Sequence, residues 1–139
     1  MSTDIRPELS KRNKYWIDKN RYYELKHFCL QYKQWKELYS LLDGAAKRVP
    51  DYIPSSVTNR YADPTVKAVT GMVYCGDRIK IVEETARRTD VDLGSYILTA
   101  VTEGRSYESI LTRYSVPCSR DTFYDRYRKF FWILDKLRM

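Results

Sequence analysis

The 139-residue sequence contains little glycine, proline, cysteine or histidine, and it has no long apolar run. With only five glycines and five prolines, most of the chain can form uninterrupted helices. The apolar run at residues 130–133 is far shorter than the ~20 residues that a membrane-spanning helix needs. The first residues also lack the apolar core of a secretory signal. We therefore expect a cytoplasmic protein with no membrane partner.

The three cysteines, Cys29, Cys75 and Cys118, are odd in number and far apart, with no C-x-x-C pair. The only histidine is His27. A disulfide framework or a zinc cluster needs more of these residues at closer spacing. We interpret the cysteines as reduced, small apolar side chains, and we expect neither a metal site nor a cofactor.

Positive charge is in excess, because 25 Lys and Arg residues stand against 18 Asp and Glu residues, a formal net charge of +7. Such a balance favours a polyanionic partner, although many basic proteins have none. Charge alone therefore indicates nucleic-acid contact only weakly.

Residues 15–42 contain no proline or glycine, and Asp43-Gly44 then looks like a C-terminal stop. The apolar residues recur at helical spacing, which predicts one long helix or two shorter ones broken near Tyr32-Lys33. This seam comprises Leu25, Phe28, Tyr32, Trp35, Tyr39 and Leu42. Residues 45–63 contain Pro50 and Pro54 without periodicity, so they are expected to form a connector.

Asp63-Pro64-Thr65 has the pattern of a helix start, with Asp as the cap and Pro in the first turn. A second seam with smaller side chains follows, made of Ala68, Met72, Cys75, Ile79, Val82 and Ala86. Large rings facing small residues favour an antiparallel helical pair, either within a chain or between two chains. We expect Trp35, Met72 and Ile79 to contribute to an oligomer or partner interface.

The C-terminal region, residues 90–139, predicts a helix-turn-helix. A helix is expected over residues 93–102, Ser106 caps a short helix, the turn contains Pro117, and Ser119 caps the last helix. Two helices joined by a tight turn, the second basic at its start, are typical of this motif. The chain is thus predicted to be one all-α domain, residues 1–139, with segments 1–44, 45–63, 64–89 and 90–139: a long N-terminal helical arm or hairpin followed by the helix-turn-helix.

The last helix divides into a buried and a polar side. The apolar side comprises Phe123, Tyr127, Phe130, Leu134 and Leu137. The opposite side carries Asp121, Asp125, Arg128, Lys129, Trp132 and Lys136. An indole on this polar side suggests a covered surface, so we expect Trp132 to contact another helix or a partner.

Side-chain chemistry assigns two sets of DNA contacts. We expect the groove to be reached by Ser119, Arg120, Thr122, Tyr124 and Arg126. Phosphates suit the cations around the motif, Arg105, Arg113, Arg128 and Lys129. Asp121 and Asp125 oppose this interpretation, because carboxylates repel phosphate. The residues alone leave open a plain solvated helix face in an interaction module.

The segment SYESILTRYSVPCSRDTFYDRYRKFFWILDKL resembles the C-terminal helix-turn-helix of the RinA/ArpU late transcriptional regulators of Firmicute phages and prophages, which is similar to region 4 of sigma factors. Ser119-Arg120-Asp121-Thr122-Phe123-Tyr124 matches the start of the recognition helix in that family, and Tyr107 and Ile110 match the preceding helix. The turn with Pro117-Cys118 is longer than usual in the family.

This resemblance implies a phage- or prophage-encoded DNA-binding regulator of transcription in the cytoplasm of a bacterial host, without enzymatic activity. Its partners would be double-stranded DNA and RNA polymerase. A homodimer through the two long helical seams would also match the symmetry of palindromic DNA sites. One alternative is a phage inhibitor of a host defence nuclease that binds the nuclease or its guide RNA. Another is a DNA-packaging protein of the small-terminase type.

Candidate acid-base pairs such as Glu83-Glu84 are expected on an outer face and not in a pocket.

Overall fold

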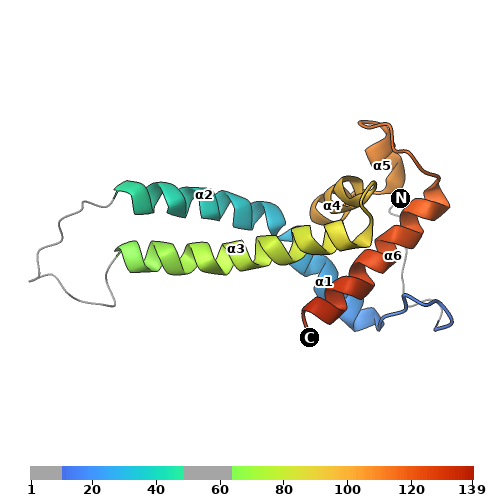
Figure 1. Cartoon of the computed structure of the whole chain (residues 1–139), viewed down its shortest axis with the longest axis horizontal. Helices are drawn as coiled ribbons and strands as arrows, with labels where there is room; N and C mark the ends of the chain where they lie inside the picture. Colours follow the sequence, from blue (N-terminus) through green and yellow to red (C-terminus); the bar gives the residue numbers. More distant parts are fainter. Residues whose placement is uncertain (1–10, 49–63) are drawn as a thin grey trace, which may run out of the picture. The chain divides into compact units, whose positions relative to one another are not determined.

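The computed structural model describes residues 11–48 and 64–139, and within these ranges it contains helices and no strand. The predicted all-α class is confirmed. The helices are α1 (Lys19–Leu30), α2 (Tyr32–Arg48), α3 (Pro64–Thr89), α4 (Gly94–Glu103), α5 (Tyr107–Leu111) and α6 (Arg120–Leu137), as drawn in Figure 1. Of the expected connector, residues 45–48 belong to α2, and residues 49–63 lie outside the described part, as does the expected Asp63 cap.

The chain divides into two compact units, where the sequence suggested one domain. The core unit takes residues 11–32 and 81–139 of the described chain, and the hairpin unit takes residues 33–48 and 64–80. Large buried side chains are concentrated in the core unit. Among the described apolar residues of the hairpin unit, only Trp35, Ala68 and Cys75 are buried. Two helices alone offer too little surface to enclose a core of their own, which explains this difference.

The N-terminal helices are separate, and the break falls at Gln31. The Gln31 amide donates to the carbonyl oxygen of Phe28 at 3.2 Å, which tightens the last turn and ends α1. At the other end, the carboxylate of Asp18 accepts from the amide of Asn20 at 3.0 Å and caps α1. The expected stop at Asp43-Gly44 is wrong, because α2 continues through Gly44 to Arg48. Within the described residues only Gly104 has a positive φ, so Gly44 does not make the left-handed turn that ends a helix.

Hydrogen-bonded turns precede and follow helix α4, and they set the direction in which the chain enters the helix-turn-helix. Before it, the Asp90 carboxylate accepts from the amides of Asp92 at 2.8 Å and Leu93 at 2.9 Å. After it, Gly104 adopts φ 67°, and its amide returns to the carbonyl of Ala100. This left-handed conformation costs little only for glycine, so Gly104 turns the chain toward α5.

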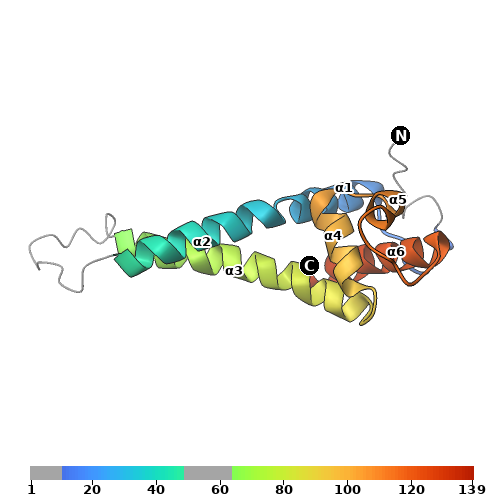
Figure 2. The same ribbon diagram turned by 90° about the horizontal axis from the view of Figure 1, so that it is seen from above.

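The core unit is built around the inner face of α6, which packs against α1, α4 and α5. The fully buried α6 residues Phe123, Phe130, Phe131 and Leu134 are joined by the nearly buried Tyr124 and Tyr127. Figure 2 shows α6 passing alongside α1 and below α5 in this unit. Leu137, which the sequence placed on this face, is 37% exposed at the end of the helix.

Polar contacts fix α1 on α6 at two points. The hydroxyls of Tyr22 and Tyr127 lie 3.1 Å apart in the buried core. The Arg21 guanidinium donates to the Asp135 carboxylate at 2.7 Å and to the carbonyl of Arg138 at 3.3 Å. Arg21 therefore donates to a backbone carbonyl at the C-terminal end of α6, where the last carbonyls have no partner within the helix. The helix dipole also favours a positive charge at this end.

We predict that Gly94→Ala destabilises the core unit. A Cβ at Gly94 would lie 2.9 Å from the carbonyl oxygen of Ala86, and backbone cannot yield as a flexible side chain does. The expected loss is about 1–3 kcal/mol of unfolding free energy, measured by urea denaturation followed by circular dichroism. The neighbouring exposed substitution Ser95→Ala is the control, with a change within about 0.5 kcal/mol. Equal stability of Gly94→Ala and the wild type would contradict this packing.

Candidate nucleic-acid interface

The helix-turn-helix is formed by α5, the turn at residues 112–119 and α6, and both helices start at serine caps. The Ser106 hydroxyl accepts from the amide of Ser109 at 3.2 Å, and the Ser119 hydroxyl accepts from the amide of Thr122 at 3.3 Å. Both caps were predicted from the sequence and are confirmed. Ser119 and Thr122 are exposed, and their hydroxyls lie 3.1 Å apart. The start of α6 thus presents two hydroxyls to solvent.

Two tyrosines lock the turn to the helices. The Tyr107 hydroxyl donates to the carbonyl of Cys118 at 2.7 Å, and the Tyr107 amide donates to the hydroxyl of Tyr124 at 3.1 Å. Tyr124 is only 4% exposed, so its predicted place in a groove is wrong. Tyr124 follows Phe123 by one residue, about 100° around the helix. The N-terminus of α5 covers this second side of α6 and buries the ring.

Arg126 also departs from its predicted role, because it holds α6 to the turn between α3 and α4. Its guanidinium donates to the Asp90 carboxylate at 3.0 Å and to the carboxylate of Asp125. The hydrogen bond to Asp90 raises the pKa of Arg126. Burial alone would raise the pKa of Asp90, but hydrogen bonds from Leu93, Arg126 and Asp92 hold it below its ordinary value. Arg126 is therefore a structural residue, and it neutralises Asp125.

Arg120 lies at the exposed start of α6 and pairs with Glu108 of α5. The two charged groups are 2.8 Å apart, and the side chains are 45% and 57% exposed. The guanidinium also lies 5.2 Å from the ring centroid of Tyr124. Exposed pairs of this kind contribute about 0–1 kcal/mol, so a phosphate or a base edge can replace Glu108 at little cost. Arg120 is thus available to a ligand, although it is not unpaired.

The four predicted phosphate contacts divide into two groups. Arg105 pairs with Glu103 at 3.1 Å and with the Ser109 hydroxyl at 3.1 Å, which fixes the corner between α4 and α5. By contrast, no carboxylate in the described ranges pairs with Arg113, Arg128 or Lys129. Arg113 is exposed in the turn, and the other two are half-buried on α6. These three cations are the ones the structure leaves free for an anion.

Trp132 is half-buried and contacts residues of its own chain. Its ring meets Tyr15 with centroids 5.6 Å apart, and the Lys136 ammonium lies 3.2 Å from its centroid. The segment before α1 therefore lies against the polar side of α6. Lys14 stands 5.0 Å from the Tyr15 ring, so this segment brings further cations to α6. The expectation that Trp132 contacts another part of the chain or a partner is met by Tyr15, but the identity of this residue could not be read from the sequence, because residues 15 and 132 meet only through the tertiary fold.

The three other predicted interface residues belong to the hairpin unit. Trp35 is 5% exposed and is covered within its own chain, so it does not present its ring to a partner. Met72 and Ile79 are half-buried. Met72 lines a groove on this unit.

Acidic and sulfur ligands are not gathered in the part of the chain that the structure describes. No group of three or more His, Cys, Asp or Glu side chains is placed there to hold a metal ion. Burial raises the pKa of the Cys29 thiol, which disfavours the reactive thiolate. Among the helices of the described ranges, none combines the length and the apolar character needed to cross a bilayer.

Comparisons of the chain with protein-family models, with curated proteins and with solved structures give no match. The resemblance to the RinA/ArpU regulators therefore remains a prediction that is based on the residues of the motif.

We predict that Asp90→Ala lowers the unfolding free energy at neutral pH by about 1–3 kcal/mol, because two amides and Arg126 lose their acceptor. Asp90 has a lower pKa in the folded than in the unfolded chain. Its contribution is thus full above the ordinary carboxyl pKa of about 4 and disappears as the pH falls through the folded value.

Urea denaturation at a series of pH values measures this effect. The difference between the wild type and Asp90→Ala should shrink as the solution is acidified below about pH 4. The control is Asp92→Ala, which removes an exposed carboxylate from the same turn. A difference that stays constant with pH would show that the carboxylate charge of Asp90 is not what stabilises the turn.

Proposed function

We propose that this protein binds double-stranded DNA through the helix-turn-helix of α5 and α6 and regulates transcription for a phage or prophage in the bacterial cytoplasm. The observation that carries the proposal is the exposed first turn of α6, where Ser119, Arg120 and Thr122 face solvent on a helix whose opposite side packs in the core. A recognition helix requires this division between a fixed side and a free N-terminal turn. RNA polymerase would be the further partner of such a regulator.

Phosphate contacts account for most of the affinity in this proposal. The open amides and hydroxyls at the start of α6 suit a phosphate, because the helix N-terminus carries partial positive charge. Arg113 in the turn and Arg128 and Lys129 farther along α6 add three cations without carboxylate partners in the described ranges. Asp125 opposes this less than the sequence suggested, because Arg126 pairs with it.

Base reading would depend on few side chains. With Tyr124 buried and Arg126 held by Asp90, only Arg120 and Thr122 remain to reach base edges, helped by the Ser119 hydroxyl. A guanidinium recognises guanine through two acceptors, and a threonine methyl contacts thymine. We expect a strong electrostatic contribution to affinity and discrimination at only a few base pairs.

We predict that Arg113→Ala, Arg128→Ala and Lys129→Ala each weaken duplex binding and each reduce the slope of log affinity against log salt by about one. Fluorescence anisotropy with labelled duplexes at several salt concentrations measures both quantities. Arg120→Ala should weaken binding to a preferred duplex more than binding to random duplex. The matched control is Lys67→Ala, an exposed cation of the hairpin unit that changes net charge equally.

Two results would count against the proposal. One is duplex binding that Lys67→Ala weakens as much as Arg113→Ala does, because binding would then follow net charge alone. The other is the absence of duplex binding at low salt, together with capture of a defence nuclease from nuclease-treated host lysate. That second result would favour the alternative function as an inhibitor.

A further inference from the structure

The segment before α1, residues 11–16, is held on the polar side of α6 by specific contacts. The carboxamide oxygen of Asn13 accepts from the amide of Tyr15 at 2.9 Å, which shapes the segment into a turn. The ring of Tyr15 meets the ring of Trp132 at 5.6 Å, and the next apolar residue, Ile17, is buried in the core. The segment therefore has a defined place on α6.

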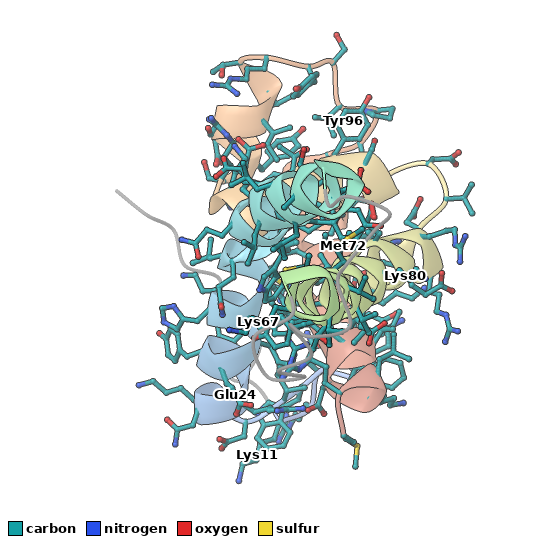
Figure 3. The ribbon with its side chains drawn as sticks, turned by 90° about the vertical axis from the view of Figure 1, so that its left-hand side faces the viewer. Lys11, Glu24, Lys67, Met72, Lys80 and Tyr96 are labelled. Carbon is teal, nitrogen blue, oxygen red and sulfur yellow. The ribbon has the colours of Figure 1, made fainter. Side chains whose placement is uncertain are left out.

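This contact gathers cations around two aromatic rings. The Lys136 ammonium lies 3.2 Å from the centroid of Trp132, and the Lys14 ammonium lies 5.0 Å from the centroid of Tyr15. Lys11 and Arg12 of the same segment are exposed, and Figure 3 shows Lys11 at the outer edge of the core unit. We call this surface the basic strip; it consists of Lys11, Arg12, Lys14, Lys129 and Lys136 around Tyr15 and Trp132.

The basic strip continues the exposed first turn of α6. Thr122, Lys129 and Lys136 are seven residues apart, so they lie within about 40° of one another on one side of the helix. Trp132 lies between the two lysines on the same side. At ~1.5 Å per residue, this row is about 21 Å long. One side of α6 therefore joins the start of the recognition helix to the segment before α1.

The strip has a net positive charge because the carboxylates around it are already engaged. They accept from neighbouring donors: Asp125 from Arg126, Asp135 and Glu24 from Arg21, and Asp18 from the amide of Asn20. By contrast, no carboxylate of residues 11–48 and 64–139 pairs with a cation of the strip. Asp121 is on the same side of α6, but it lies eleven residues from Trp132, about 17 Å along the helix axis.

We propose that the basic strip binds the phosphate backbone of the duplex that the helix-turn-helix contacts, so that α6 lies along the duplex with this side toward it. This inference rests on the proposed function and adds the segment before α1 to the interface. A strand of B-DNA carries one phosphate per ~3.4 Å of helix axis, so a row of 21 Å is matched by about six phosphates. Lysines contact phosphates without reading bases, so the strip adds affinity for any sequence.

The two rings act as positioning residues in this proposal. Tyr15 and Trp132 are half-buried against each other, and each has an ammonium group near its ring. The ring contact holds Lys14 on the same side of α6 as Lys136. An anionic membrane also offers phosphates, but helices that bind its surface insert an exposed apolar face, whereas this side of α6 carries lysines. The observations therefore favour a nucleic acid.

Fluorescence anisotropy with a labelled duplex of about 20 base pairs at several salt concentrations tests the strip. The double variant Lys14→Ala, Lys136→Ala should bind about tenfold more weakly at ~0.1 M salt. It should also reduce the slope of log affinity against log salt by about two. The matched control is Lys67→Ala, Lys80→Ala, which removes two exposed lysines of the hairpin unit, both labelled in Figure 3. This control should leave the slope unchanged.

A variant without a charge change tests the role of the ring contact. Tyr15→Ala should release the segment from Trp132 and therefore lower both the affinity and the slope, which a dependence on net charge alone does not predict. The matched control is Tyr74→Ala in the hairpin unit, because Tyr74 is also partly exposed and has the Arg78 guanidinium 3.5 Å from its centroid. Circular dichroism confirms that each variant keeps its helices.

The outcomes separate this inference from the proposed function. Duplex binding that Arg113→Ala weakens, but that the double variant and Tyr15→Ala leave unchanged, would overturn the basic strip and keep the helix-turn-helix interface. A wild type that does not bind duplex at low salt would overturn both. Tighter binding to phosphatidylserine vesicles than to duplex, lost in the same double variant, would assign the strip to a membrane and so contradict the inference.

Discussion

The buried aromatic side of α6 is the contact on which the core unit depends. Rings follow one another from Tyr107 through Phe123, Tyr124, Tyr127 and Phe131 to Tyr22, with neighbouring centroids 5.0 to 5.9 Å apart. Most of these pairs meet edge to face, the arrangement that the charge distribution of aromatic rings favours. Through this series one helix holds α1 and α5 at once, and the rotation of α6 about its axis is therefore fixed.

A fixed rotation determines which polar residues of α6 remain free. The same packing that buries Tyr124 brings Arg126 to Asp90 and leaves Arg120 and Thr122 in solvent. The polar residues of α6 are thus divided between structural ones and available ones, which are Arg120 and Thr122 in the first turn and Arg128 and Lys129 farther along the helix. Under the DNA-binding proposal, this division leaves several cations for phosphate contacts and few side chains for base edges.

The parts of the fold that follow local rules could be predicted from the sequence, and the parts that depend on distant residues could not. Ser106 and Ser119 cap their helices because a serine before a helical segment satisfies an open amide, whatever surrounds it. The pairing of Arg126 with Asp90 and the contact of Trp132 with Tyr15 join residues far apart in the chain, so helical spacing could not name these partners, although it placed Trp132 where a contact was expected. The possible break near Tyr32-Lys33 lies within a residue of the observed one at Gln31, whereas the stop expected at Asp43-Gly44 was wrong, because a glycine can also stand inside a helix.

The core unit is discontinuous, since residues 33–80 intervene between its two parts. During synthesis, α1 leaves the ribosome well before α4 and α6, the helices against which its apolar residues Tyr22, Leu25 and Phe28 pack. Contacts between segments so far apart in sequence form only after the long loop between them has closed, and closing that loop costs chain entropy. We therefore expect the core unit to complete its packing only once the C-terminal helix has been made.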